Sequence, residues 1–194
     1  MMLTIGHSTL SIDAFLRALK DNAVELLVDV RRFPGSRRHP QFGQEALFAA
    51  LREAGIAAEW REGLGGRRKA AKDSVNAGWR ESSFRGYADY MQTAAFRAEI
   101  DWLAVAAASR TTVVMCAEAV PRRCHRSLIA DAMIARGVVV EDIFVAADGK
   151  SSRKVHKLTP FACVDGERLW YPAETGELFG KECASGGAIG LGRE

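Results

Sequence analysis

The sequence predicts an α/β fold: a mainly parallel sheet of about five strands with helices on both faces, and a small β-hairpin at the C-terminal end. Short apolar runs alternate with amphipathic helical patterns along most of the chain, which favours strands joined by crossover helices. The apolar runs are continuous, as they are in strands that are buried on both faces. After residue 146 this alternation stops, and a hairpin signal follows.

The first half of the chain supplies three strands and two helices. Ser11 is placed to cap the first helix, whose apolar residues recur every three or four positions. Pro34 and Gly35 then force a loop after the second strand. Gly55 follows the second helix and can adopt the left-handed backbone conformation that ends many helices. The expected strands are 3–6, 25–30 and 56–61. The first expected helix begins after Ser11, and the second spans 44–54.

The second half completes the sheet and adds the hairpin. A helical region runs from Ser83 to about Ser109, with one expected break, and strands are expected over 111–115 and 138–145. Between these two strands lies a helix over 124–136, which Gly137 ends. Asp165-Gly166, between apolar runs at 161–164 and 167–171, is a type I′ hairpin signal. We therefore expect a core domain over 1–146, a hairpin appendage over 147–180 and a disordered tail over 181–194.

Composition indicates a globular protein that does not enter membranes. The 194 residues are 48% hydrophobic and 26% charged, which is ordinary for one domain with its own core. No apolar run approaches the roughly 20 residues of a membrane span, and the N-terminus lacks the layout of a signal peptide. A cytoplasmic location follows as the expectation. The cytosol disfavours disulfides, so the four cysteines (116, 124, 163 and 183) are expected to be reduced.

Basic residues gather in three places although the net charge is only +3. The first group lies at 31–38, the second at 61–72 and the third at 122–126. They are either solvated loops or a positive surface for an anionic partner, such as a phosphate-bearing small molecule or a nucleic acid.

Chemically active residues follow four of the predicted strands. In a parallel sheet the carboxyl ends of the strands share one edge, where α/β proteins bind ligands. Four polar clusters that meet at one edge therefore predict a pocket. The residues concerned are His7 and Ser8, Asp29 and Arg31, Gly65 and Gly66, and Cys116 and Glu118.

The loop that begins at Cys116 allows several chemistries. Cys116 and Arg122 have the spacing of cysteine phosphatases, but the loop contains no glycine and Pro121 has no N–H to give to a phosphate. Cys124, His125 and Arg126 begin a helix. There they could bind an anion, Cys124 could be a reactive thiol, or Arg126 could pair with Glu118 or Asp29. The cysteines lack the C-x2-C spacing typical of zinc sites, so neither a metal nor a cofactor is expected.

Five motifs, taken together, resemble one protein family. They are T-I-G-H-S at 4–8, D-V-R-x2-P-x-S at 29–36, L-G-G at 64–66, F-x-G-Y-A-x-Y-M at 84–91 and C-x-E-x5-C-H-R at 116–126. The sequence from about residue 3 to about 145 resembles the bacterial and archaeal family called domain of unknown function 488. The resemblance implies no particular activity. It implies a family signature that includes His7, Ser8, Asp29, Arg31, Pro34, Ser36, Gly65, Gly66, Cys116, Glu118, Cys124, His125 and Arg126.

The function that the sequence favours is an enzyme, a hydrolase or transferase, acting on a phosphate-bearing substrate such as a nucleotide or a nucleic-acid end. The expected catalytic residues are Asp29 or Glu118 as general base, Cys116 as nucleophile, and His7. The expected substrate contacts are Ser8, Arg31, Ser36, Gly65, Gly66, Cys124, His125 and Arg126. Two other functions fit the same residues: a non-catalytic nucleotide- or nucleic-acid-binding module, and a thiol- or metal-based sensor.

Overall fold

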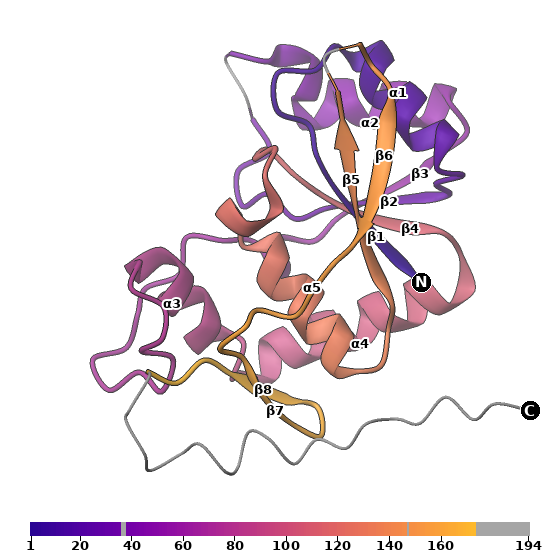
Figure 1. Ribbon diagram of the computed structural model, residues 1–194. Coiled ribbons are helices and arrows are strands. Elements are labelled where there is room, and N and C mark those ends of the chain that lie inside the picture. The colour runs from indigo at the N-terminus through magenta and orange to yellow at the C-terminus, as the bar shows by residue number, and fades with distance from the viewer. Residues whose placement is uncertain (36–37, 147, 174–194) are drawn as a thin grey trace, which may run out of the picture.

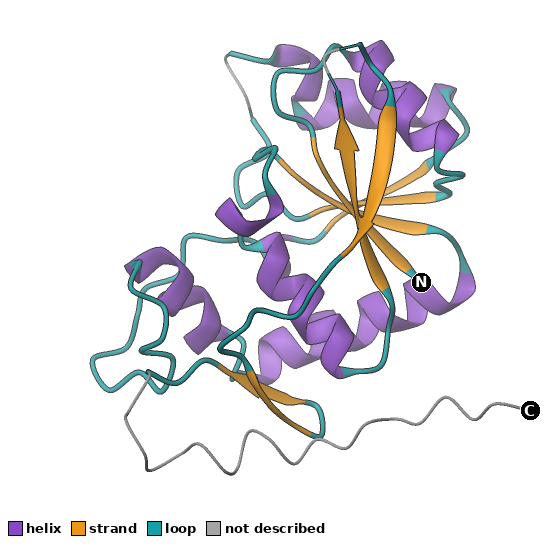
Figure 2. Cartoon of the chain, viewed as in Figure 1, coloured by secondary structure: helices purple, strands orange, loops and turns teal. Residues whose placement is uncertain are grey.

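A computed structural model describes residues 1–35, 38–146 and 148–173 of the chain. Six strands form one sheet in the order β3-β2-β4-β1-β5-β6 (Figures 1 and 2). The first five strands run parallel, and β6 pairs antiparallel with β5. The expected α/β class and mainly parallel sheet are confirmed. The strands are β1 (Met2–Gly6), β2 (Leu26–Asp29), β3 (Ala57–Trp60), β4 (Thr112–Cys116), β5 (Val140–Val145) and β6 (Ser151–Val155).

Helices cover both faces of this sheet. Successive strand residues point to opposite faces, so Leu3 joins the core under α1 and α2, whereas Met2 joins the core under α4 and α5. Figure 1 shows the two groups of helices on either side of the strands. The helices are α1 (Ile12–Asp21), α2 (Gln44–Glu53), α3 (Ser82–Tyr90), α4 (Ala94–Ser109) and α5 (Arg126–Ala135), with 3₁₀ turns at Pro40–Phe42, Glu62–Leu64 and Pro121–Arg123.

Local signals in the sequence set the helix ends. The Ser11 hydroxyl accepts a hydrogen bond from the Ala14 N–H at the start of α1. The expected break in the 83–109 region falls between α3 and α4, where the Thr93 hydroxyl caps α4 through the Phe96 N–H. Gly55 and Gly137 stop α2 and α5 with φ of +76° and +75°, a backbone conformation that glycine adopts most easily.

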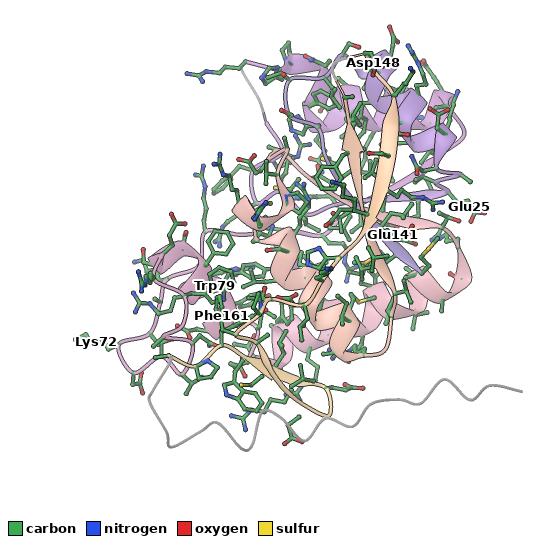
Figure 3. All side chains as sticks on the ribbon, viewed as in Figure 1. Glu25, Lys72, Trp79, Glu141, Asp148 and Phe161 are labelled. Carbon is green, nitrogen blue, oxygen red and sulfur yellow. The ribbon has the colours of Figure 1, made fainter. Side chains whose placement is uncertain are left out.

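A small hairpin packs at the far end of α5. Its strands, β7 (Cys163–Asp165) and β8 (Arg168–Trp170), pair antiparallel. Gly166 has φ of +57°, but Glu167 does not have positive φ, so the turn is not the type I′ turn that the sequence suggested. Trp79, in the loop before α3, contacts Phe161 edge to face (Figure 3). The hairpin thus closes over aromatic residues from the middle of the chain.

Two findings differ from the expectations: an additional strand and a disulfide-bonded cysteine. β6 (Ser151–Val155) belongs to the main sheet, although its residues carry no apolar pattern that predicts a strand. Cys116 and Cys124 are free, but Cys163 is disulfide-bonded, so the expectation of four reduced cysteines is wrong for Cys163. Ser36, Cys183 and the expected tail lie outside the described residues. Among the described helices, none is long and apolar enough to cross a membrane.

Candidate functional site

The carboxyl edge of the sheet opens where the loop after β4 turns away from its neighbours. The chain leaves β4 toward α5 on one face, whereas β1 and β2 lead to α1 and α2 on the other face. Loops that diverge in this way leave a crevice at the carboxyl ends of the strands. The strand ends meet there in register, since Gly6 pairs with Cys116 and Asp29 pairs with Met115.

Asp29, Arg31 and His7 form a buried frame beneath this edge. Asp29 is fully buried, and its carboxylate accepts hydrogen bonds from Nε and Nη2 of Arg31 at 2.6–3.1 Å. Arg31 also donates from Nη1 to the carbonyl of Phe42 at 2.7 Å and to Nε2 of His7 at 3.5 Å. His7 stacks on the Phe42 ring, and burial together with the Arg31 charge lowers its pKa to about 4. Since Asp29 is fully engaged by Arg31, the frame fits a structural role better than general-base catalysis.

Arg126 also lies inside the protein. Its side chain is fully buried, and its guanidinium donates to the carbonyl oxygens of Glu118 and Ala119 and to the Thr4 hydroxyl. Gly6 makes room for this arrangement, because a Cβ at Gly6 would lie 1.9 Å from the Glu118 oxygen and 2.9 Å from Nη1 of Arg126. Among the described residues, the partners of Arg126 are therefore two carbonyls of the β4–α5 loop and the Thr4 hydroxyl, rather than the carboxylates of Glu118 or Asp29.

Cys116 is also buried, although it lines a pocket. It ends β4 with 9% of its surface exposed. A hydrogen bond from the Cys124 thiol lowers the pKa of Cys116 to about 7, helped by the N–H groups of Ala117 and Glu118 and by the Arg126 charge. The same contact, with burial, raises the pKa of Cys124. The contact therefore favours the thiolate form of Cys116 over that of Cys124.

His125 lies against the same pair of thiols. Its Nε2 donates to the carbonyl of Val30 at 3.1 Å, and because a carbonyl only accepts, Nδ1 keeps its lone pair. Nδ1 lies 3.7 Å from Sγ of Cys124. Burial lowers the pKa of His125 to about 4, so the ring is neutral at physiological pH. Sγ of Cys116, Sγ of Cys124 and one ring nitrogen of His125 all lie within 4.8 Å of one another, a spacing that suits a soft metal ion.

A pocket of about 230 Å³ opens above Cys116 and His125. Two of its residues, Arg32 and Arg67, have no carboxylate partner among the described residues. Both guanidinium groups lie near the ring of Phe33, at 5.9 and 5.4 Å from its centroid, and that ring is 63% exposed. The walls of the pocket are Arg31, Arg32, Phe33, Gly66, Arg67, Cys116, Ala117 and His125.

The glycines of the L-G-G motif shape this pocket. A Cβ at Gly66 would lie 2.9 Å from Nδ1 of His125, and one at Gly65 would lie 3.0 Å from Cβ of Arg32. Arg67 follows with φ of +60°, a conformation that is strained for a residue other than glycine. Strain of this kind concentrates at functional sites, so Arg67 supports the choice of this pocket.

The remaining residues that the sequence singled out lie around the pocket or away from it. The Glu118 carboxylate is exposed and accepts the N–H of Val120. Ser8, at φ of +47°, borders a separate hollow beside β5. Ser36 is outside the described residues. Sequence reasoning missed Phe33 altogether, and it saw Arg32 and Arg67 only as members of basic clusters, because nothing in their local pattern marks them as pocket residues.

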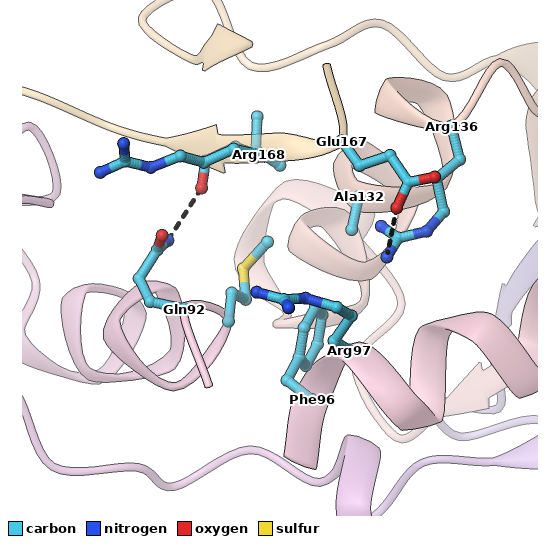
Figure 4. Close-up of a pocket in the computed structure, with 9 residues that line it drawn as sticks. Gln92, Phe96, Arg97, Ala132, Arg136, Glu167 and Arg168 are labelled. Atoms are coloured by element: carbon cyan, nitrogen blue, oxygen red, sulfur yellow. Dashed lines mark hydrogen bonds and ion pairs between the residues drawn. The ribbon is translucent and has the colours of Figure 1, made fainter. Parts of the chain in front are cut away.

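A larger pocket, of about 480 Å³, lies elsewhere, between α4, α5 and β8 (Figure 4). Met91, the last residue of the F-x-G-Y-A-x-Y-M motif, lines it, but the candidate site residues do not. One of its cations, Arg136, is already paired with Glu167 and with Asp101, at 3.3 and 3.1 Å. A large volume alone does not indicate a reaction, and we do not assign the functional site to this pocket.

Fold and site together define an α/β protein with a cysteine pair and a histidine at the carboxyl edge of a parallel sheet. The model of the family described as "Domain of unknown function DUF488" matches residues 11–133, more than half of the chain, and the chain belongs to this family. This match confirms the resemblance on which the sequence analysis relied. Comparisons with curated proteins and with solved structures found no match.

Proposed function

We propose that the protein is an enzyme that acts on a nucleotide or a similar phosphate-bearing substrate in the pocket above Cys116. The observation that carries this proposal is a pocket lined by Cys116 and by two guanidinium groups, of Arg32 and Arg67, that have no carboxylate partner among the described residues. A phosphate group supplies the missing negative charge, and Arg binds it with two parallel hydrogen bonds.

The exposed Phe33 ring favours a nucleotide over a simple phosphate ester. An exposed aromatic side chain at a pocket wall offers a surface for a nucleobase, and stacking contributes about 1–3 kcal/mol per base. The two arginines lie on this same ring. One ligand can therefore place its phosphate on the guanidinium groups and its base on Phe33.

The reaction takes place beside Sγ of Cys116. Cys116, Cys124 and His125 are the reactive side chains that lie together at this pocket. Gly65 and Gly66 give the substrate and the His125 ring room to approach. Asp29, Arg31 and His7 hold the strand ends from below, which makes them positioning residues in this proposal.

Binding of adenosine monophosphate, measured by calorimetry, tests the proposal. Each hydrogen bond to a charged group contributes about 1.5–3 kcal/mol, so Arg32→Ala and Arg67→Ala should each weaken binding about tenfold or more. Phe33→Ala should weaken the nucleotide more than inorganic phosphate. Arg110→Ala is the matched control, since Arg110 is exposed and precedes β4 at the opposite edge of the sheet.

Equal affinity in Arg32→Ala, Arg67→Ala and Arg110→Ala would contradict the assignment. Turnover of nucleotide mono- and diphosphates, followed by release of phosphate or nucleoside, separates the enzyme from a binding module. Tight binding without turnover of any of them would support the non-catalytic alternative.

A further inference from the structure

We propose that Cys116, Cys124 and His125 bind one Zn²⁺ ion, and that the fourth coordination position of this ion faces the pocket. This inference deepens the proposed function, because it supplies the reactive group of the same site.

The spacing of the three ligand atoms fits zinc. Zinc–sulfur and zinc–nitrogen bonds of about 2.3 and 2.0–2.1 Å place the ligands of a tetrahedral shell roughly 3.5–3.8 Å apart. The Cys124 sulfur already lies 3.7 Å from Nδ1 of His125, and all three atoms lie within 4.8 Å. A shift of about 1 Å by Cys116 or His125 is then enough to close the shell around the ion.

The His125 ring has the orientation of a metal ligand. Histidines that bind metals almost always donate their other N–H to a carboxylate, a carbonyl or water, which fixes the tautomer. His125 does this through Nε2 to the carbonyl of Val30. Its remaining lone pair, on Nδ1, points at the thiol pair. Tyr87 further holds the ring, with centroids 5.0 Å apart.

The surroundings leave one side of the site accessible. Cys116 and His125 line the 230 Å³ pocket, whereas Cys124 lies behind them at 5% exposure. Three protein ligands and one open position are the pattern of catalytic zinc sites, in which the fourth ligand is water or substrate. On binding, each thiol gives its proton to solvent and the sulfur donates an electron pair to the ion, with no change of oxidation state.

A zinc-bound water would meet a phosphate held by Arg32 and Arg67. Zinc lowers the pKa of its bound water to about 7, so a hydroxide is available for attack on the substrate at neutral pH. The attack forms a bond from this oxygen to the phosphorus of the substrate, and the leaving-group oxygen departs with the electron pair of the broken P–O bond and takes up a proton from solvent. The reaction is therefore a hydrolysis that needs no oxidant or reductant.

Metal content and Co²⁺ substitution test the site in the full chain. Reduced wild-type protein should retain one zinc per chain after dialysis, and Co²⁺ should give sulfur-to-metal charge-transfer bands in its absorption spectrum. Cys116→Ser and His125→Asn should each weaken zinc binding by more than about 100-fold, beyond the 10- to 100-fold loss typical of changes around the ligands. His39→Asn is the matched control, because His39 lies outside the cluster of three ligand residues. Circular dichroism establishes that each variant is folded.

If a ligand variant does not fold, protection of the wild-type thiols decides. Zinc should slow iodoacetamide labelling of Cys116 and Cys124 together, as mapped by mass spectrometry. A reduced, folded wild type that binds no zinc, or labelling that zinc leaves unchanged, overturns the inference. If zinc does not bind but adenosine monophosphate still binds in a way that depends on Arg32 and Arg67, the proposed function stands. If zinc binds but the nucleotide does not, only the proposed function is overturned.

Discussion

Replacing Arg126 with alanine should destabilise the fold by about 3–4 kcal/mol. The change leaves two carbonyl oxygens, of Glu118 and Ala119, without the donor of a partly buried hydrogen bond, and the Thr4 hydroxyl loses its contact with Nε of Arg126. Each unsatisfied buried group costs about 1–3 kcal/mol, which gives roughly 2–6 kcal/mol. Removing a buried charge that has no carboxylate partner among the described residues recovers part of this loss. The net value is a large share of the 5–15 kcal/mol that holds a typical domain together.

Urea denaturation followed by circular dichroism measures this loss. Arg126→Met retains the buried stem of the side chain, so the difference between Met and Ala separates packing from hydrogen bonding. Arg122→Ala, at an exposed position of the same loop, should change stability by less than about 0.5 kcal/mol. If Arg126→Ala lowers the free energy of unfolding by less than about 1 kcal/mol, and the dependence of that free energy on urea concentration is unchanged, the reasoning is refuted. Arg126 would then be a ligand-binding residue.

Three further predictions concern the buried groups around the site. Asp29→Asn should cost about 3–5 kcal/mol in urea denaturation, because it leaves the Arg31 charge buried without its partner, whereas exposed Asp73→Asn should cost almost nothing. His156 contacts the carboxylates of Asp131 and Asp142, and although burial alone would lower its pKa, these partners raise it to about 9. The stability that protonated His156 contributes should be complete below about pH 6.5 and should be lost as the pH rises through 9. His156→Ala should lack this contribution at every pH. If the melting temperatures of wild type and His156→Ala fall in parallel above pH 6.5, the prediction is wrong. Gly66→Ala should weaken zinc binding, because its Cβ would lie 2.9 Å from Nδ1 of His125, and Gly35→Ala, which meets no atom within 4 Å, is the control.

Much of the fold could be predicted because its local signals agree with its packing. The apolar runs that became β1, β2 and β4 are buried on both faces, and Ser11, Gly55 and Gly137 mark helix ends by their own chemistry. β6 carries the sequence SSRKV and is mostly exposed at the edge of the sheet. It has no apolar pattern to detect, and its place depends on pairing with β5, which only the tertiary structure determines.

The candidate site was only partly predictable, for reasons of packing. Strand ends of a parallel sheet meet at one edge, so the convergence of Asp29, Cys116 and their neighbours follows from the strand pattern alone. From sequence, however, an arginine in the first turn of a helix is expected at the surface. The burial of Arg126 depends on the path of the Glu118–Ala119 loop over Gly6. Likewise, Phe33 becomes a pocket wall only because the loop after β3 returns beside it.

A crystal structure of the protein with adenosine monophosphate tests the central claim most directly. The account predicts the phosphate between the guanidinium groups of Arg32 and Arg67, the base against Phe33, and a phosphate oxygen turned toward Cys116. A nucleotide bound instead in the larger pocket beside β8, or no nucleotide at saturating concentration, would contradict it.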